Sequence, residues 1–206
     1  MNAIKTYEFE DGGWLQIFHD DNPSNPREFD LNVSTIIGFH PRYNIGDKNP
    51  YGGPKGDFYE LDDVKSQIEA DNDVVVIRPL YMYDHTGQAF SMTPFYCRWD
   101  SGQVGWIFAT SESVKKVWGK EFAEVGEEKV LAGIQAELET YQQYANGEIF
   151  GFVLTVPKET CKTCGHQETE GDSCWGFYGS DPLENGMVDH LPEKYAKELK
   201  EVSQTA

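Results

Sequence analysis

One long amphipathic helix is the strongest structural signal in the sequence. Between Glu127 and Ala145 the apolar residues recur every three or four positions, and Asn146–Gly147 supplies a stop signal. A helix with one apolar stripe needs a hydrophobic surface to cover. Short alternating or apolar runs typical of strands flank it, at residues 6–10, 14–18, 35–39, 74–83, 90–96, 104–108, 148–156 and 173–178. The pattern therefore predicts a helix packed on a sheet.

The order of these segments indicates the fold class. Strands and helices do not alternate regularly, which disfavours a doubly wound parallel sheet. Shorter helices are expected at residues 61–70 and 111–119 and after Pro192. We predict an α+β fold, a mainly antiparallel sheet with one long amphipathic helix and a few short helices. The length of 206 residues suits a single globular domain, 1–206, with a cysteine-containing hairpin loop at 157–174.

Net charge is the extreme feature of the composition. The chain has 35 acidic and 17 basic residues, a net charge of −18, spread evenly rather than collected in a tail. Such a body repels phosphate backbones, so direct binding of DNA or RNA is disfavoured, whereas basic protein surfaces are attracted. The longest apolar run, 149–156, is too short to cross a membrane, and no secretory signal pattern opens the sequence. We expect a cytoplasmic protein with no membrane partner.

The cysteines suggest a metal site in the hairpin loop. Cys161 and Cys164 are three positions apart, and two such thiolates can hold one tetrahedral zinc ion, with Cys174 and His166 as further ligands. This is half of a zinc signature, because no second Cys-x-x-Cys pair is present. Free or oxidisable thiols are the alternative. Redox catalysis is disfavoured because Pro157 and the hairpin differ from the strand-to-helix setting of a redox pair. A structural zinc ion is the one cofactor that the sequence suggests.

A second group of polar residues follows predicted strands. Arg42 can bind an anion, with His40 beside it as an acid or base. The structural alternative is an ion pair between Arg42 and Asp47 that fixes the loop. Asp84 and His85 are adjacent, so in a strand they point to opposite faces, and His85 would need a carboxylate from elsewhere.

Asp100 and Ser101 lie in a tight Asp-Ser-Gly turn. The turn lacks the G-x-S-x-G spacing of an α/β-hydrolase, and its composition is also that of an ordinary turn. Large aromatic residues such as Trp99, Trp106 and Trp175 are expected in the core. The sequence identifies no catalytic residue, and the ligand-binding candidates are His40, Arg42, Asp47, His85, Asp100 and Ser101.

Several stretches carry a family resemblance. In order along the chain they resemble an uncharacterised protein family encoded by bacteriophage and prophage genomes. The resemblance implies a phage setting and brings no known activity, and the Cys-x-x-Cys segment is not part of the family pattern. The stretches are Asn25–Asp30, Phe39–Asp47, Tyr83–His85, Trp99–Trp106 and Asp172–Gly179.

Two functions from different classes follow. The first is a phage-encoded acidic accessory protein in the cytoplasm of the bacterial host, an anti-defence inhibitor that mimics DNA and binds a basic nucleic-acid-handling host protein. It would be a binding protein rather than an enzyme. The alternative is an enzyme, or a binder of a small anionic, nucleotide-like ligand. That alternative requires its residues to converge on one pocket, namely His40, Arg42, Asp47, His85 and Asp100.

Overall fold

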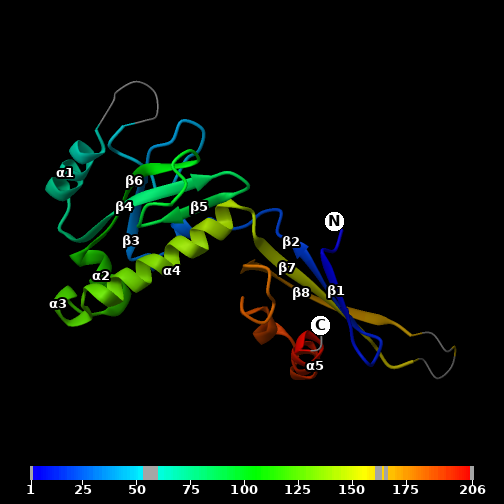
Figure 1. Ribbon diagram of the computed structural model, residues 1–206. Coiled ribbons are helices and arrows are strands. Elements are labelled where there is room, and N and C mark those ends of the chain that lie inside the picture. The colour runs from blue at the N-terminus through cyan, green and yellow to red at the C-terminus, as the bar shows by residue number, and fades with distance from the viewer. Residues whose placement is uncertain (1, 53–59, 161–163, 165–166, 205–206) are drawn as a thin grey trace. The chain divides into compact units, whose positions relative to one another are not determined.

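The protein is divided into two compact units. The computed structural model describes residues 2–52, 60–160, 164 and 167–204. Unit 1 is built from residues 1–24 and 147–206, and unit 2 from residues 25–146. Each unit has its own antiparallel sheet and hydrophobic core (Figure 1), whereas the sequence suggested a single domain. The difference arises because apolar patterns locate strands without showing which strands pair.

The sheet of unit 2 has four strands in the order β3-β6-β4-β5, and every neighbouring pair is antiparallel. With the helices around it, this confirms the α+β prediction. The last strand is shorter than predicted, because residues 92–96 leave the sheet and Pro94 cannot donate a ladder hydrogen bond. The strands are β3 (Ser34–Gly38), β4 (Val74–Asp84), β5 (Gln88–Ser91) and β6 (Ser101–Thr110).

Helices cover both faces of this sheet. The long helix α4 spans Glu127–Ala145, as the sequence predicted, and buries its apolar stripe against one face. Helix α1 (Leu61–Asp71) packs on the opposite face. The central strand β6 is therefore buried on both sides. Shorter elements complete the unit: η1 (Pro26–Glu28), α2 (Ser111–Trp118) and α3 (Phe122–Val125).

A buried arginine holds several segments of unit 2 together. Only 3% of the Arg27 side chain is exposed, and it forms ion pairs with Asp47 at 2.9 Å and Glu137 at 3.2 Å. Its Nη2 also donates to the carbonyl of Ser34 at 2.6 Å. Asp47 in turn accepts the Ile36 N–H at 2.7 Å. Arg27 thereby fixes the loop after β3 to that strand and to α4.

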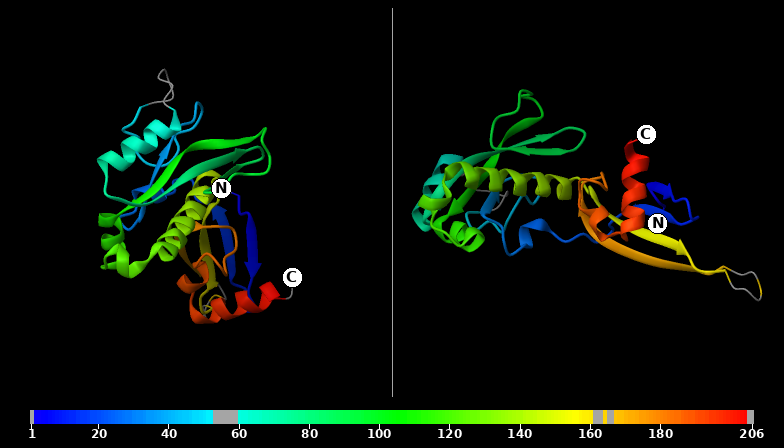
Figure 2. Two further views of the ribbon diagram at one scale, coloured as in Figure 1. Left: turned by 60° about the vertical axis from the view of Figure 1, so that its left-hand side comes forward. Right: turned by 90° about the horizontal axis from the view of Figure 1, so that it is seen from below.

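The sheet of unit 1 has the order β1-β2-β7-β8, again antiparallel. The predicted N-terminal hairpin and the pairing of residues 148–156 with 173–178 are confirmed, and β7 and β8 run side by side in each view of Figure 2. One face packs against the last helix. The elements are β1 (Lys5–Glu8), β2 (Trp14–His19), β7 (Ile149–Pro157), β8 (Thr169–Tyr178), η2 (Met187–His190) and α5 (Glu193–Gln204). None of the described helices, in either unit, is long and apolar enough to cross a membrane.

A carboxylate ties α5 to the turn between β1 and β2. Asp11 accepts hydrogen bonds from Lys194 Nζ at 2.6 Å, from the Tyr195 hydroxyl at 2.7 Å and from the Gly13 N–H at 2.9 Å. The bond from Lys194, followed by the one from Tyr195, lowers the pKa of Asp11 from 3.8 to about 2. Burial and the bond to Asp11 raise the pKa of Tyr195 to about 12.

The low pKa of Asp11 predicts a pH-dependent stability of unit 1. Because the folded state favours the ionised form, the stabilisation is complete above pH 4 and is lost as the pH falls towards 2. We expect Asp11→Asn to lower the free energy of unfolding by about 1 kcal/mol at pH 7 and to flatten its decline below pH 4. Urea denaturation at pH 7, 4 and 3 measures both effects.

The matched control is Asp21→Asn, which changes an exposed aspartate of the same unit. Its stability should follow the wild-type pH profile within about 0.5 kcal/mol. Equal profiles for the two variants would show that Asp11 does not anchor α5.

Candidate ligand-binding site

A pocket of about 330 Å³ lies at one end of the unit 2 sheet. Because β6 runs antiparallel to both β3 and β4, the start of β6 lies beside the ends of these two strands. The loops that leave them meet at this edge, which is where binding residues are commonly placed. The pocket is lined by His40, Arg42, Met82, Asp84, Trp99, Asp100, Ser101, Gly102 and Val104.

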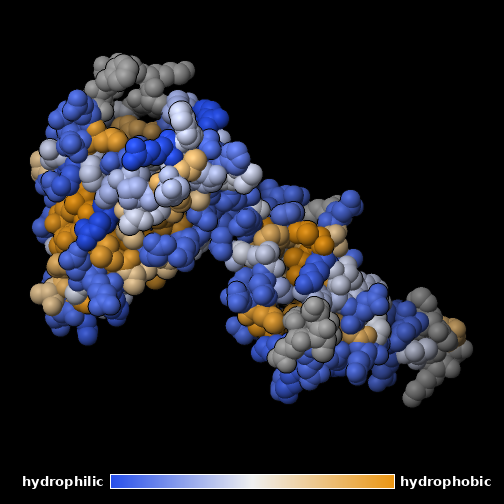
Figure 3. All heavy atoms as spheres, viewed as in Figure 1, coloured by the Kyte–Doolittle hydropathy of each residue, from blue (hydrophilic) through white to orange (hydrophobic). Residues whose placement is uncertain are grey.

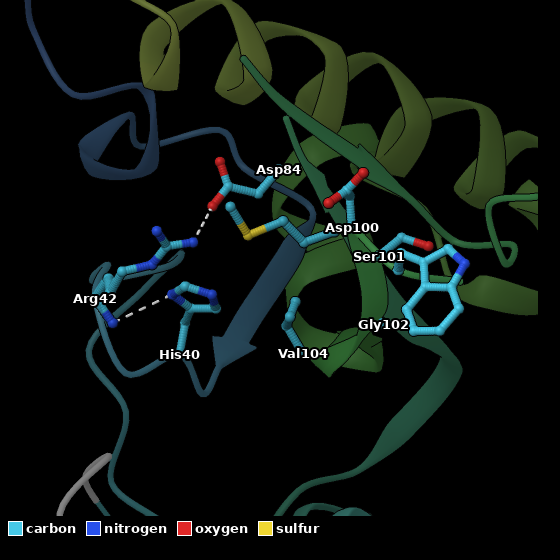
Figure 4. Close-up of a pocket in the computed structure, with 9 residues that line it drawn as sticks. His40, Arg42, Asp84, Asp100, Ser101, Gly102 and Val104 are labelled. Atoms are coloured by element: carbon cyan, nitrogen blue, oxygen red, sulfur yellow. Dashed lines mark hydrogen bonds and ion pairs between the residues drawn. The ribbon is translucent and has the colours of Figure 1, made fainter. Parts of the chain in front are cut away.

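Four of the six sequence candidates line this pocket. Figure 4 shows His40 and Arg42 on one side and Asp100 and Ser101 on the other. They come from two segments separated by more than fifty positions in the sequence. The topology of the sheet, rather than any local motif, brings them together.

Arg42 pairs with a residue other than the expected one. Its Nη2 lies 2.5 Å from Oδ2 of Asp84 at the end of β4 (Figure 4), and not beside Asp47. Two-thirds of the Arg42 side chain is exposed, 66%, whereas Asp84 is largely buried at 19%. Asp84 therefore orients the guanidinium while most of its surface stays open to the solvent.

His40 is held as a neutral hydrogen-bond donor. Its Nδ1 accepts the backbone N–H of Arg42 at 3.3 Å, and its ring stacks on Tyr43 with centroids 4.9 Å apart. Burial, followed by the positive charge of Arg42, lowers the pKa of His40 below 6.5, although Asp84 opposes this. The ring is therefore neutral at pH 7, and because Nδ1 is an acceptor the proton resides on Nε2.

Asp100 connects the pocket to two neighbouring side chains. Its Oδ2 lies 3.6 Å from Nδ1 of His85 and 3.7 Å from Sγ of Cys97. His85 thus meets a carboxylate from a separate segment, although it does not itself line the pocket. The hydroxyl of Ser101 donates to the carbonyl oxygen of Cys97. Since that bond uses its proton, Ser101 is not arranged as a nucleophile with a base.

The expectation of a core position is confirmed for Trp106 and wrong for Trp99 and Trp175. Trp106 is buried, but Trp99 is 95% exposed, and the neighbouring Tyr96 is fully exposed. Trp175 is 40% exposed and lies over Gly151, where a Cβ would come within 2.1 Å of the indole. Trp99 and Asp84 line the pocket although neither was predicted as a site residue. The exposed turn around residues 99–102 was the available signal for Trp99.

Asp47 lies outside the pocket, which corrects its place among the candidates. Its carboxylate is used by Arg27 and by the Ile36 N–H. It therefore stabilises the loop that carries His40 and Arg42. The alternative prediction, in which Asp47 fixes the loop through an ion pair, is therefore correct about the role of Asp47. It is wrong about the partner, which is Arg27 and not Arg42.

The cysteine candidates divide into two places. Cys161 and His166 lie outside the described residues, and Cys164 is exposed in the hairpin loop. Cys174 belongs to β8, with its Sγ 4.0 Å from Nδ1 of His190. Thr169 is the first residue of β8 and therefore the residue of that strand nearest the loop. Cys174 is five residues further along the strand, about 17 Å away, so it is not beside the loop. A zinc ion held by the loop stays a prediction, and no cluster able to hold a metal occurs in the described ranges.

Comparisons with known proteins identify neither a family nor a function for this chain. No protein-family model, curated protein or solved structure matches this chain.

Proposed function

We propose that this protein binds a small polar ligand in the pocket formed by the ends of β3 and β4 and the start of β6. The observation that carries the proposal is the convergence of Arg42, Asp84 and Asp100 with His40 in one cavity. Ligand pockets combine an apolar lining with a few convergent polar groups. Here Met82, Val104 and Trp99 supply the apolar part.

The arrangement suits binding rather than a proton-transfer reaction. Arg42 and Asp84 satisfy each other's charge at 2.5 Å, and neutral His40 offers one N–H. The hydroxyl of Ser101 is engaged by a backbone carbonyl. Fixed donors and acceptors of this kind orient a ligand without requiring that any of them change protonation state.

Removing Arg42 should weaken ligand binding without unfolding the protein. The test is a thermal-shift screen of small polar metabolites against wild type and Arg42→Ala. A ligand at 100 times its Kd stabilises the folded state by about 2.7 kcal/mol, which raises Tm by several degrees. We expect Arg42→Ala to weaken Kd at least about tenfold, which lowers the stabilisation by about 1.4 kcal/mol and so removes at least about half of the shift.

The control for this screen is Arg78→Ala. Arg78 is also a partly exposed arginine of unit 2 paired with a carboxylate, Glu127, but it lies outside the pocket. It should keep the full ligand-induced shift. The proposal fails if no compound shifts Tm, or if both variants respond as wild type does.

Charge favours a second candidate function, which is the anti-defence inhibitor. The chain has 35 acidic and 17 basic residues, so its net charge stays at −18 however the charged groups pair. Hydrophilic residues predominate on the face of both units shown in Figure 3. Such a surface is attracted to the basic groove of a nucleic-acid-handling protein, and the phage resemblance supplies the setting.

The inhibitor hypothesis predicts salt-sensitive capture of a basic host protein. A pull-down from bacterial lysate at 50 and 300 mM salt should retain a basic partner at the lower concentration and lose it at the higher, because the Debye length falls below about 10 Å above 0.1 M salt. Capture that is equally strong at both concentrations, or of acidic proteins, would contradict it.

A further inference from the structure

The charges of the pocket argue against an anionic ligand. Among its lining residues Arg42 carries one positive charge, and Asp84 and Asp100 carry two negative charges. His40 is neutral at pH 7, because burial and Arg42 lower its pKa. The remaining positive charge is already compensated by Asp84 at 2.5 Å. A phosphate or carboxylate entering the pocket would therefore meet a net negative site within a protein of net charge −18.

The polar groups of the pocket instead match neutral hydroxyl groups. Arg42 and the Nε2–H of His40 are donors, and the carboxylates of Asp84 and Asp100 are acceptors. A hydroxyl both donates and accepts, so adjacent hydroxyls on one ring satisfy a donor and an acceptor at the same time. The Arg42–Asp84 pair presents these two functions side by side (Figure 4).

An exposed indole completes this chemistry. Trp99 is 95% exposed although it lines the pocket, so it offers a flat apolar surface at the entrance. A sugar ring has one face rich in C–H groups, which packs on an aromatic ring while its hydroxyls point outward. Trp99 is the one indole among the lining residues, so a planar base would find an extended stacking surface on one side only.

We propose that the pocket binds a single neutral sugar ring, with Trp99 as its platform and Arg42, Asp84 and Asp100 as its hydroxyl ligands. The inference rests on the proposed ligand-binding function and names its ligand class. A volume of about 330 Å³ is near the lower end of ligand pockets, about 300–1,000 Å³, which suits one ring better than a dinucleotide.

Titration with defined probes tests the sugar class directly. The neutral sugars are methyl glucoside, methyl galactoside, methyl mannoside and N-acetylglucosamine. The competing probes are adenosine and guanosine, which are neutral and planar, and AMP and inorganic phosphate, which are anionic. Tryptophan fluorescence and calorimetry of the full chain should show at least one sugar binding with a Kd of about 1 mM or tighter.

Variants test whether sugar binding depends on Trp99 itself or on any exposed aromatic side chain. Trp99→Ala should weaken sugar binding at least about tenfold, and Asp100→Asn should weaken it by a similar factor. Tyr96→Ala is the matched control, because Tyr96 is an equally exposed aromatic three positions away that does not line the pocket. It should bind as wild type does. Circular dichroism confirms that each variant is folded.

The possible outcomes distinguish the two proposals. Binding of a sugar that depends on Trp99 but not on Tyr96 supports both. Binding of nucleosides alone, or of AMP or phosphate alone, with dependence on Arg42 overturns the sugar inference and keeps the ligand pocket. Sugar binding that is unchanged in Trp99→Ala places the sugar elsewhere and overturns the inference. Failure of every probe here and of every compound in the thermal-shift screen overturns both.

Discussion

Arg27→Met is expected to lower the free energy of unfolding of unit 2 by about 3–5 kcal/mol. The substitution leaves Asp47 and Glu137 without the guanidinium that lies 2.9 and 3.2 Å from them. Both carboxylates are mostly buried, so each would keep its desolvation cost without its ion pair. Methionine retains the length of the buried side chain, so lost charge pairing rather than lost volume dominates the effect. Urea denaturation and hydrogen exchange of the α4 amides report the loss.

Arg78→Met is the matched control for Arg27→Met. Arg78 pairs with Glu127, but both side chains are substantially exposed, so this substitution should cost no more than about 1 kcal/mol. Comparable losses from the two variants would mean that burial of the Arg27 network contributes nothing. Arg27→Met should also weaken ligand binding, because Asp47 anchors the loop that carries Arg42.

Gly105→Ala is expected to destabilise unit 2 by about 3 kcal/mol. Gly105 lies in β6 between Gly38 of β3 and Leu80 of β4. A Cβ at this position would lie 1.9 Å from the carbonyl oxygen of Ile37 and 3.0 Å from the Gly38 Cα. Both contacts are with backbone, so no side-chain rotation relieves them, and β3 must shift away from β6.

Gly102→Ala provides the same chemical change on the same strand. A Cβ at Gly102 meets nothing within 4 Å, and the residue does not have a positive φ. Its effect should stay within about 0.5 kcal/mol of wild type or be slightly stabilising. If Gly105→Ala were as mild as Gly102→Ala in urea denaturation, the close approach of β3 to β6 would be wrong.

Local patterns predicted most elements of the fold. The helix over Glu127–Ala145 was correct at both ends, because its stripe and its stop signal agree. The division into two units was not predicted, since β2 pairs with β7, which follows all of unit 2 in the sequence. Strand partners separated by so many positions are not specified by periodicity.

Only part of the pocket could be predicted from the sequence, for a related reason. His40, Arg42 and Asp100 stood out as polar residues in loops next to strands. Asp84 was considered only in relation to its neighbour His85, whereas its partner Arg42 lies 42 positions away. The partner of Asp47 is Arg27, which lies 20 positions earlier in the chain. Ion pairs between remote segments follow from topology and cannot be inferred from spacing.

The insertion of unit 2 between β2 and β7 has a consequence for synthesis on the ribosome. Domains generally fold as units during translation, N-terminal parts first. Residues 25–146 form one continuous stretch, so unit 2 can complete its own sheet as soon as they have left the ribosome. At that point β2 has already been made, but its partner β7 has not. We therefore expect the β1–β2 hairpin to stay incompletely folded, with Leu15 and Ile17 exposed to the solvent, until β7 and β8 have been translated.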